Sequence, residues 1–453
     1  MLKTKLTLFL LSCLVVTAMA QDDRIRYMDH TYNDNIKSIQ FGLRGVALSQ
    51  PIIGLNTNTR LQLEFDDLGE IERNYNYRVI LCDADWTPSS ISELEYVEGF
   101  NGERIREFDY SINTRVEYTH YSLTLPNNEL QLRYSGNYLL LIYEDNDDQT
   151  PILSRRFMVV EPLFNISSAV VRTIRADKIQ THHEIDFSVL HKNFVIDNPP
   201  LEVKVVILQN NDWGNAITGL APLYDRAERL VYDFQDRIVF PAGKEFRFLD
   251  LRNLRFKNGW IKSIEQYNDG YEVVLNTDKK RDDKTHSTFN DINGKFVIEN
   301  LDENASRRRV ETQFIGNTDS IQTTTFFEYD PTNPINALRA DYANVRFSLR
   351  SPFEIDDQDV YLFGAITDWQ LKEEFKMEYN DLDRQYQCET VLKQGYYDYV
   401  YVTTPKGEMT HSVEEIEGNS HETENDYTIL VYYRPFGARY DRLLAVQTFN
   451  SNE

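Results

Sequence analysis

The chain has 453 residues, with 72 acidic and 48 basic side chains and a net charge of −24. Its 41% hydrophobic content is ordinary for a globular protein and too low for a protein that crosses a membrane many times. The acidic excess argues against binding to nucleic acid and against binding to anionic lipid by charge. A chain of this length predicts roughly three domains.

The first 20 residues have the pattern of a secretory signal peptide. Two lysines precede an apolar run from Leu6 to Val16, and residues 18–20 (Ala-Met-Ala) provide a cleavage site of small residues. The apolar run is too short to span a membrane. We therefore expect an exported mature chain that starts near Gln21. A second interpretation remains open, because residues 10–13 (Leu-Leu-Ser-Cys) loosely resemble a lipoprotein box with Cys13 as the lipidated residue.

Short runs of alternating or continuous apolar residues recur along the mature chain, and stretches with a helical period are scarce. Examples are residues 139–143, 203–208, 245–249 and 397–402, with polar turns between such runs. A period of two over four to eight residues is typical of β-strands. The sequence thus predicts an all-β protein built from tandem β-sandwich domains of the immunoglobulin-like kind.

An aspartate–tryptophan pair occurs three times in a matching context. Each pair follows an apolar strand and precedes a glycine and an aromatic strand; the pairs are Asp85-Trp86, Asp212-Trp213 and Asp368-Trp369. We interpret each tryptophan as the cover of its own sandwich core. This repeat predicts three sandwich domains, over residues 21–162, 163–330 and 331–453. The last boundary lies in a two-proline linker at residues 330–334.

Two cysteines remain after removal of the signal peptide, Cys82 and Cys388, and both lie in strand-like runs. We expect two buried free thiols, and a disulfide between them stays open because exported proteins meet an oxidising compartment. The sequence lacks the motifs of nucleotide-binding loops, α/β-hydrolases and zinc proteases. The run His182-His183-Glu184 alternates between the two faces of a strand. We therefore expect no catalytic residue, no metal site and no cofactor.

Seven stretches carry a more specific resemblance, and they are found in this order: Cys82–Ser89, Glu95–Asn101, Ser111–Thr114, Tyr118–Tyr121, Ser135–Tyr138, Phe240–Arg247 and Gly364–Trp369. In order and spacing they resemble the plug protein family of the bacterial type IX secretion system, over essentially the whole mature chain. The resemblance implies a non-enzymatic protein of the periplasm whose partner is a large outer-membrane β-barrel translocon. It would dock at the periplasmic opening of that barrel and seal it when nothing is transported, without entering the membrane.

The insertion between Pro88 and Arg115 is a candidate contact region for such a partner, because binding residues concentrate on loops of rigid scaffolds. Its candidate partner-binding residues are Tyr96, Phe100 and Asn101. Packing of the two aromatic side chains beneath the loop is an equal alternative, and both interpretations stay open.

The third predicted domain also resembles the early-set domains that bind α-glucan. Residues 360–369 match the opening strand, glycine and tryptophan of those domains, and residues 394–399 match a later strand. The alternative function is therefore an envelope glycan-binding accessory protein, with a platform of Trp369, Tyr396 and Tyr399. Methionine stands at position 409, where those domains have a second tryptophan, and this loss of stacking area weakens the sugar-binding interpretation.

Overall fold

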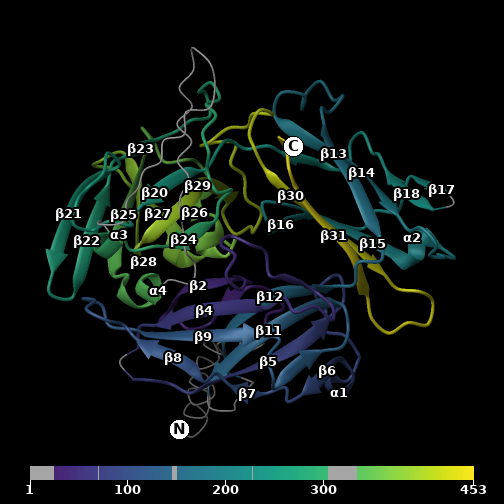
Figure 1. Cartoon of the computed structure of the whole chain (residues 1–453). Helices are drawn as coiled ribbons and strands as arrows, with labels where there is room; N and C mark the ends of the chain where they lie inside the picture. Colours follow the sequence, from purple (N-terminus) through teal and green to yellow (C-terminus); the bar gives the residue numbers. More distant parts are fainter. Residues whose placement is uncertain (1–24, 70, 145–149, 227, 305–333, 453) are drawn as a thin grey trace, which may run out of the picture.

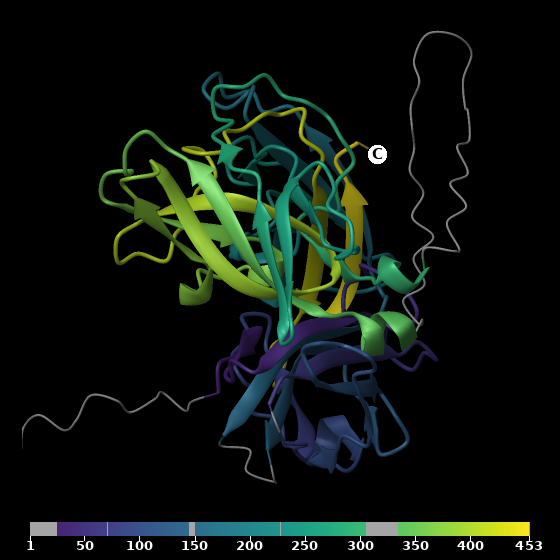
Figure 2. The same ribbon diagram turned by 90° about the vertical axis from the view of Figure 1, so that its left-hand side faces the viewer.

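The computed structural model describes residues 25–69, 71–144, 150–226, 228–304 and 334–452. The predicted signal peptide, Cys13 and residues 330–333 of the predicted linker lie outside this part of the chain. The described residues form three β-rich units, with the first unit beneath the other two (Figures 1 and 2). The predicted all-β fold is confirmed, because the described residues are mainly in strands and each of their helices is only a turn or two long. Among the described helices, none has the length and apolar character needed to cross a membrane.

The first unit, residues 25–162, is a sandwich of two main sheets. The larger sheet has the spatial order β1 (His30–Thr31), β12 (Pro151–Val160), β11 (Gly136–Glu144), β5 (Tyr75–Cys82) and β7 (Glu103–Arg104), and β3 (Ile52–Gly54) also pairs with β12. The facing sheet has the order β2 (Ile36–Leu43), β4 (Leu61–Asp67), β9 (Thr119–Leu125) and β8 (Glu107–Tyr110). In the insertion, the one-turn helix α1 (Glu93–Tyr96) leads directly into the short strand β6 (Val97–Gly99). Strand β6 pairs with β10 (Leu130–Leu132) and forms a separate two-stranded sheet.

The second unit is built from two distant parts of the chain, residues 163–241 and 424–452. One sheet has the order β13 (Asn165–Val171), β14 (His182–Leu190), β18 (Arg229–Tyr232) and β17 (Tyr224–Arg226), and β19 (Val239–Pro241) pairs with β14. The other sheet has the order β16 (Asp212–Ile217), β15 (Val203–Gln209), β30 (Asp426–Tyr433) and β31 (Arg442–Asn450). Alternate residues of β14, β15 and β30 form the core between the sheets, and the one-turn helix α2 (Pro199–Glu202) leads into β15.

The third unit, residues 242–304 and 334–423, is a ten-stranded sheet around one core. Its main path runs β20 (Arg247–Asp250), β29 (Gly395–Pro405), β26 (Gln358–Phe363), β27 (Lys376–Asn380), β28 (Gln385–Lys393), β25 (Tyr342–Arg350), β22 (Gly270–Leu275) and β21 (Ile261–Tyr267). Two short strands join it, β23 (Asp278–Lys279) on β25 and β24 (Phe296–Ile298) on β29. The short helices of this unit are α3 (Leu301–Asn304), α4 (Pro334–Arg339), η1 (Ala365–Thr367) and η2 (Glu373–Phe375).

The sheets do not follow the expected division into residues 163–330 and 331–453. Strand β15 pairs with β30 over seven residues, so the end of the chain completes the second unit. Strand β20 pairs with β29, so residues near 250 belong to the third unit. The correction has a physical reason, because strand pairing depends on partners far along the chain and the linker pattern carries no information about them.

The first and second units pack sheet on sheet. The outer face of β5, β11 and β12 and the outer face of β15, β30 and β31 share one apolar cluster, which includes Leu139, Met158, Val206 and Leu430. Within it the Tyr432 hydroxyl donates to Asn137 Oδ1 at 2.8 Å. Because β11 and β30 are covered on both faces, their sequences are nearly continuous apolar runs, without alternation of apolar and polar residues.

Candidate functional site

The first two aspartate–tryptophan pairs, one in a turn and one at the start of β16, meet at strand β12, between the first and second units. The Trp86 and Trp213 rings make an edge-to-face contact with their centroids 5.1 Å apart. The Arg156 guanidinium lies 4.6 Å from the first ring and 5.1 Å from the second. Such cation–π contacts are strongest where water is excluded, and Trp86 is only 5% exposed. The two tryptophans therefore seal the contact between two units, instead of each covering its own core.

The third turn meets the same strand from its opposite face. Arg155 precedes Arg156, so its side chain points the other way. Arg155 Nη2 lies 3.1 Å from Asp368 Oδ1, and Lys372 Nζ lies 2.7 Å from the other oxygen of that carboxylate. Burial opposes the charged form of Asp368, but the two cations outweigh it and hold its pKa below the usual range. Two adjacent arginines thus connect all three aspartate–tryptophan pairs.

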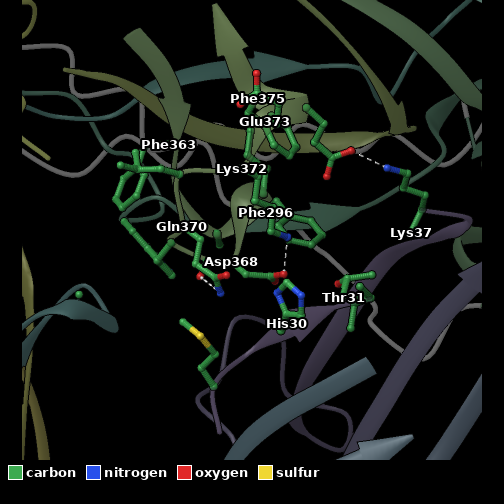
Figure 3. Close-up of a pocket in the computed structure, with 18 of the residues that line it drawn as sticks. His30, Thr31, Lys37, Phe296, Phe363, Asp368, Gln370, Lys372, Glu373 and Phe375 are labelled. Atoms are coloured by element: carbon green, nitrogen blue, oxygen red, sulfur yellow. Dashed lines mark hydrogen bonds and ion pairs between the residues drawn. The ribbon is translucent and has the colours of Figure 1, made fainter. Parts of the chain in front are cut away.

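A cavity of about 730 Å³ lies beside this junction. Its wall comes from the β1–β2 segment of the first unit, the η1–η2 segment of the third and residues 214–215 of the second. Figure 3 shows His30 beside Asp368, with Phe296 and Phe363 on the third-unit side. Burial lowers the pKa of His30 to about 4, and the neighbouring arginine and lysine act in the same direction. His30 is therefore neutral at physiological pH, and the cavity has a neutral imidazole beside a paired carboxylate.

The cavity has the composition of an interface between units. Lys37 Nζ bridges to Glu374 Oε2 at 2.7 Å across it, from β2 of the first unit to η2 of the third (Figure 3). Within the described part of the chain, no three His, Cys, Asp or Glu side chains are placed to hold a metal ion. The ion pairs Lys37–Glu374 and Arg155–Asp368 cross between the first and third units at this cavity, so they help to hold the two units together.

A second polar link joins the first and third units through buried charges. Asp66, on β4, is 1% exposed and accepts hydrogen bonds from Lys393 Nζ at 2.5 Å and from the Tyr342 hydroxyl at 2.6 Å. Its other oxygen lies 2.7 Å from His120 Nδ1. Burial opposes the charge of Asp66, but Lys393 and His120 outweigh it and hold the pKa of Asp66 below its usual range. A buried carboxylate with three partners from two units fixes their relative position.

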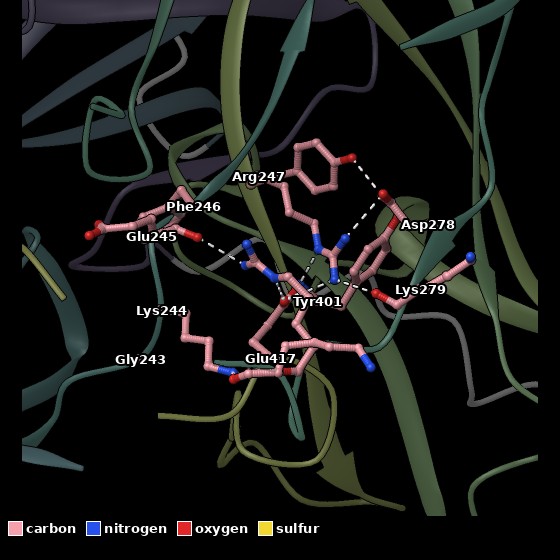
Figure 4. Close-up of polar contacts among 12 residues, drawn as sticks. Gly243, Lys244, Glu245, Phe246, Arg247, Asp278, Lys279, Tyr401 and Glu417 are labelled. Carbon is pink, nitrogen blue, oxygen red and sulfur yellow. Dashed lines mark hydrogen bonds and ion pairs between the residues drawn. The ribbon is translucent and has the colours of Figure 1, made fainter. Parts of the chain in front are cut away.

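A third polar cluster fastens the loop around residue 417 to the third-unit sheet (Figure 4). Glu417 is fully buried, and its carboxylate forms ion pairs with Arg247 Nε at 2.9 Å and with Arg281 Nε at 2.7 Å. The Tyr401 amide donates to the same carboxylate at 3.0 Å. Arg247 also lies 3.0 Å from Asp278 Oδ1. Residues 414–417 form a turn, and Glu417 lies in the interior as its anchor.

The predicted partner-binding residues have three different environments. Tyr96 is 5% exposed and packs in the core of the first unit. Asn101 fastens the insertion to β5, because its Oδ1 accepts from the Val79 amide at 2.7 Å and its Nδ2 donates to Val79 O at 2.9 Å. Phe100 is 69% exposed. Of the three, Phe100 is the side chain that a partner can reach in the described structure.

The residues of the alternative glycan platform do not share one exposed face. Trp369 packs edge-to-face against Phe246 and Phe363 beside the junction cavity. Tyr399 is 4% exposed and belongs to the third-unit core. Tyr396 stacks on Phe248 at 5.7 Å on another part of that unit. A sugar ring therefore cannot lie across all three in this conformation.

The histidines at positions 183 and 411 have structural partners. His183 lies 3.0 Å from the Tyr427 hydroxyl and 2.8 Å from His421 O, inside the second unit. His411 packs on the Phe363 ring with 4.2 Å between centroids.

Both mature cysteines are buried and free, as we expected. Burial raises the pKa of each thiol to about 12.

Sequence reasoning missed the side chains that join the units, namely Arg155, Arg156, Asp66 and Lys393, and it missed Glu417, which anchors a loop within the third unit. One signal was present for the arginines. Two adjacent charges inside the apolar run of residues 151–160 must each face a partner if both sides of the strand are covered. Nothing local distinguishes the other three from ordinary surface charges.

Comparison with known proteins gives the family. Residues 36–161 match the family model described as the type 9 secretion system plug protein 1st domain. The chain is also similar to a hypothetical protein from Parabacteroides merdae ATCC 43184, known from a 2.30 Å crystal structure. The TM-score is 0.83 at 33% identity, and the match covers 94% of this chain and 100% of that one.

A second structural match, the DNA-bound alkylpurine DNA glycosylase AlkC of Pseudomonas fluorescens, has a TM-score of 0.15 at 7% identity. It covers 28% of this chain and 30% of that one, and it carries no argument. No curated protein sequence matches the chain. On the family model and the full-length structural match, this chain belongs to the type IX secretion system plug protein family.

Proposed function

We propose that this chain is a non-enzymatic plug of the type IX secretion system. It docks at the periplasmic opening of the large outer-membrane translocon barrel and closes that opening while nothing is transported. The observation that carries the proposal is the match of residues 36–161 to the plug family, within a chain of which 94% aligns with the structure of a relative.

The geometry supports this role because a plug must resist deformation while it covers an opening. The three units are joined by the Trp86–Arg156–Trp213 contact, by the Arg155–Asp368 ion pair and by the buried Asp66 link. Contacts of this kind leave little freedom for the units to move separately, in contrast to ordinary linked domains. The chain therefore behaves as one obstructing body.

The charge of the chain supports attachment through a protein partner. A net charge of −24 disfavours contact with anionic lipid headgroups. We infer that the protein resides in the periplasm, at the inner face of the outer membrane, and is held there by the barrel. The predicted signal peptide over residues 1–20 agrees with export to that compartment.

Affinity purification tests the docking. Tagged mature protein is used to capture partners from detergent-solubilised outer membrane of the source bacterium, and bound proteins are identified by mass spectrometry. We expect a single very large β-barrel protein in stoichiometric amount. Recovery of no such barrel under mild detergent conditions would contradict the proposal.

A permeability measurement tests the sealing separately. Deletion of the gene should raise the susceptibility of the cells to antibiotics too large for ordinary porins, and this rise should disappear when the barrel is also deleted. Unchanged susceptibility after the single deletion would show that closing the barrel is not the role of this protein, even if the two proteins bind.

A further inference from the structure

The connection between β30 and β31, residues 434–441, presents a phenylalanine ring to solvent. Phe436 is fully exposed, at 102%, whereas aromatic rings of this size are usually buried or half-buried. Gly437, with φ at 85°, and the hydrogen bond from the Ala438 amide to Pro435 O at 3.0 Å form the turn that displays it. Figure 1 shows this connection projecting at the lower right, below α2.

The connection is fixed at both ends. The Arg434 amide donates to Glu202 O at 2.8 Å, and the Arg434 guanidinium lies 2.9 Å from Asp83 Oδ2 in the first unit. At the other end Asp441 is 1% exposed and accepts from Lys204 Nζ at 2.8 Å. The ring is thus held at a defined place on the molecule, instead of on a free loop. A rigid aromatic side chain loses little entropy when a partner binds it.

Two exposed leucines come from elements that contact the same connection. Leu201 in α2 is 76% exposed, and its neighbour Glu202 bonds to the connection as described above. Leu94 in α1 is 80% exposed, and its neighbour Glu95 forms an ion pair with Arg439 of the connection. Apolar side chains from the first unit and from both parts of the second therefore gather at one end of the molecule.

Phe100 belongs to the same end. The adjacent Asn101 donates from Nδ2 to Glu93 Oε2 at 3.0 Å, which holds the segment of Phe100 against α1. We refer to Leu94, Phe100, Leu201 and Phe436 as the hairpin-end surface. Each of the four side chains is more than two-thirds exposed in the described structure.

The charges around this surface indicate what it contacts. Residues 93–98 carry three glutamates and no cation, and the pairs Glu95–Arg439 and Glu98–Arg133 lie beside the apolar side chains. Apolar anchors with a polar rim are the usual anatomy of a protein–protein interface. Glu95 and Glu98 already have arginine partners, so the charge argument rests on the whole chain: its net charge of −24 disfavours an anionic lipid surface and favours a protein partner with basic groups near the apolar contact.

We propose that the hairpin-end surface is the face by which this chain docks on the barrel, with Phe436 seated in an apolar pocket that basic side chains of the barrel surround. The inference rests on the plug function proposed above and adds the docking face and the chemistry of its partner. Phe436 is the central anchor, and Leu94, Phe100 and Leu201 extend the contact across the units. Salt weakens the association because the rim contacts are charged.

A matched pair of variants tests this surface. The test variant carries Leu94→Ser, Leu201→Ser and Phe436→Ser. The control variant carries Phe256→Ser, Phe353→Ser and Leu382→Ser, which remove three equally exposed side chains of the third unit. Binding of each to the purified, detergent-solubilised barrel is measured by biolayer interferometry, and a photoreactive phenylalanine at position 436 or 382 is used for crosslinking in cells. Circular dichroism and melting curves establish that all variants are folded.

We expect the test variant to lose affinity about tenfold or more, since aromatic anchors dominate interfaces, and the control variant to bind as the wild type does. Crosslinks to the barrel should form from position 436 and not from position 382. Equal binding of the test variant would overturn the docking face and leave the plug function intact. Failure of the wild type to bind the barrel would overturn both. Lipid-vesicle binding or self-association that depends on Phe436 would also overturn the docking face.

Discussion

The buried link between Asp66 and Lys393 gives the sharpest test of how the first and third units are held together. Lys393→Met removes the ammonium group that lies 2.5 Å from Asp66 Oδ2 and keeps most of the side-chain volume. Lys393 is 2% exposed and Asp66 is 1% exposed, so water cannot replace the lost charge. The backbone oxygen of Ala337, which also accepts from Lys393, keeps its hydrogen bond from the Tyr118 hydroxyl at 2.9 Å.

Removing one partner of a buried ion pair usually costs about 3–5 kcal/mol in the free energy of unfolding, because the other charge is left uncompensated. Asp66 keeps its contacts with the Tyr342 hydroxyl and His120 Nδ1. We therefore expect a loss near the lower end, about 3 kcal/mol. The double variant Asp66→Asn/Lys393→Met removes the stranded charge as well, and it should be more stable than Lys393→Met alone.

The pH dependence has a defined sign. The folded-state pKa of Asp66 is lowered, so its stabilising contribution is present above the unfolded value of 3.8 and is lost as the pH falls through the folded value. The difference between wild type and Lys393→Met should therefore be largest near neutral pH and shrink below about pH 4.

Urea unfolding followed by far-ultraviolet circular dichroism measures these differences. The control is Lys376→Met, which breaks the partly exposed ion pair of Lys376 with Asp359 at 3.2 Å; its expected cost is below about 1 kcal/mol. The reasoning is refuted if Lys393→Met costs no more than Lys376→Met, or if the double variant is less stable than the single one.

Three further predictions concern buried ionisable groups. Glu417→Gln removes the buried carboxylate charge that Arg247 and Arg281 share and leaves Arg247 with Asp278 alone, so the unfolding free energy should fall by about 3 kcal/mol at neutral pH. Because the pKa of Glu417 is lowered, this loss should fade as a pH series of urea titrations moves below about pH 4. Asp398→Asn should raise the melting temperature at about pH 8 and change it little at about pH 4. Burial and a neighbouring carboxylate raise the pKa of Asp398 to about 8 in the folded state. Above pH 3.8 the carboxyl therefore ionises in the unfolded chain but stays protonated in the folded one, which lowers the stability of the fold. An unchanged melting temperature at about pH 8 would contradict this. Cys82 and Cys388 should resist a thiol reagent in the folded mature chain and react in urea without reductant, since both are free and buried; a missing reaction in urea would reveal a disulfide.

The strand content of the fold was predictable, because short runs of alternating or continuous apolar residues mark strands within the local sequence. Residues 139–143 and 203–208 were recognised as strands, and they lie in β11 and β15. The division of the chain after residue 330 was not predictable, because β15 pairs with β30 across more than 200 positions of intervening sequence. A strand that finds its partner so far away carries no sign of it in its own residues.

The candidate site was predictable in part. The aspartate–tryptophan repeat marked three important turns, but single-domain reasoning assigned each tryptophan to its own core. Trp86 and Trp213 instead contact each other, because the sheets that carry them pack on their outer faces. The continuous apolar character of β11 was the available clue, since a strand with one solvated face alternates. Among the predicted partner-binding residues, Phe100 is exposed, whereas Tyr96 lies in the core because α1 turns it inward.

The path of the chain limits how a plug of this kind can leave an opening. The chain enters the second unit at residue 163, forms the third unit, and returns to complete the second unit with β30 and β31. The third unit is therefore held to the second by two chain crossings, and to the first by Asp66 and by Arg155. Swinging one unit away would break buried charge pairs, each of which costs several kcal/mol to separate. Under the docking proposed above, release at the hairpin-end surface would break contacts with the partner alone, so the plug would leave the barrel as one rigid body, without opening first.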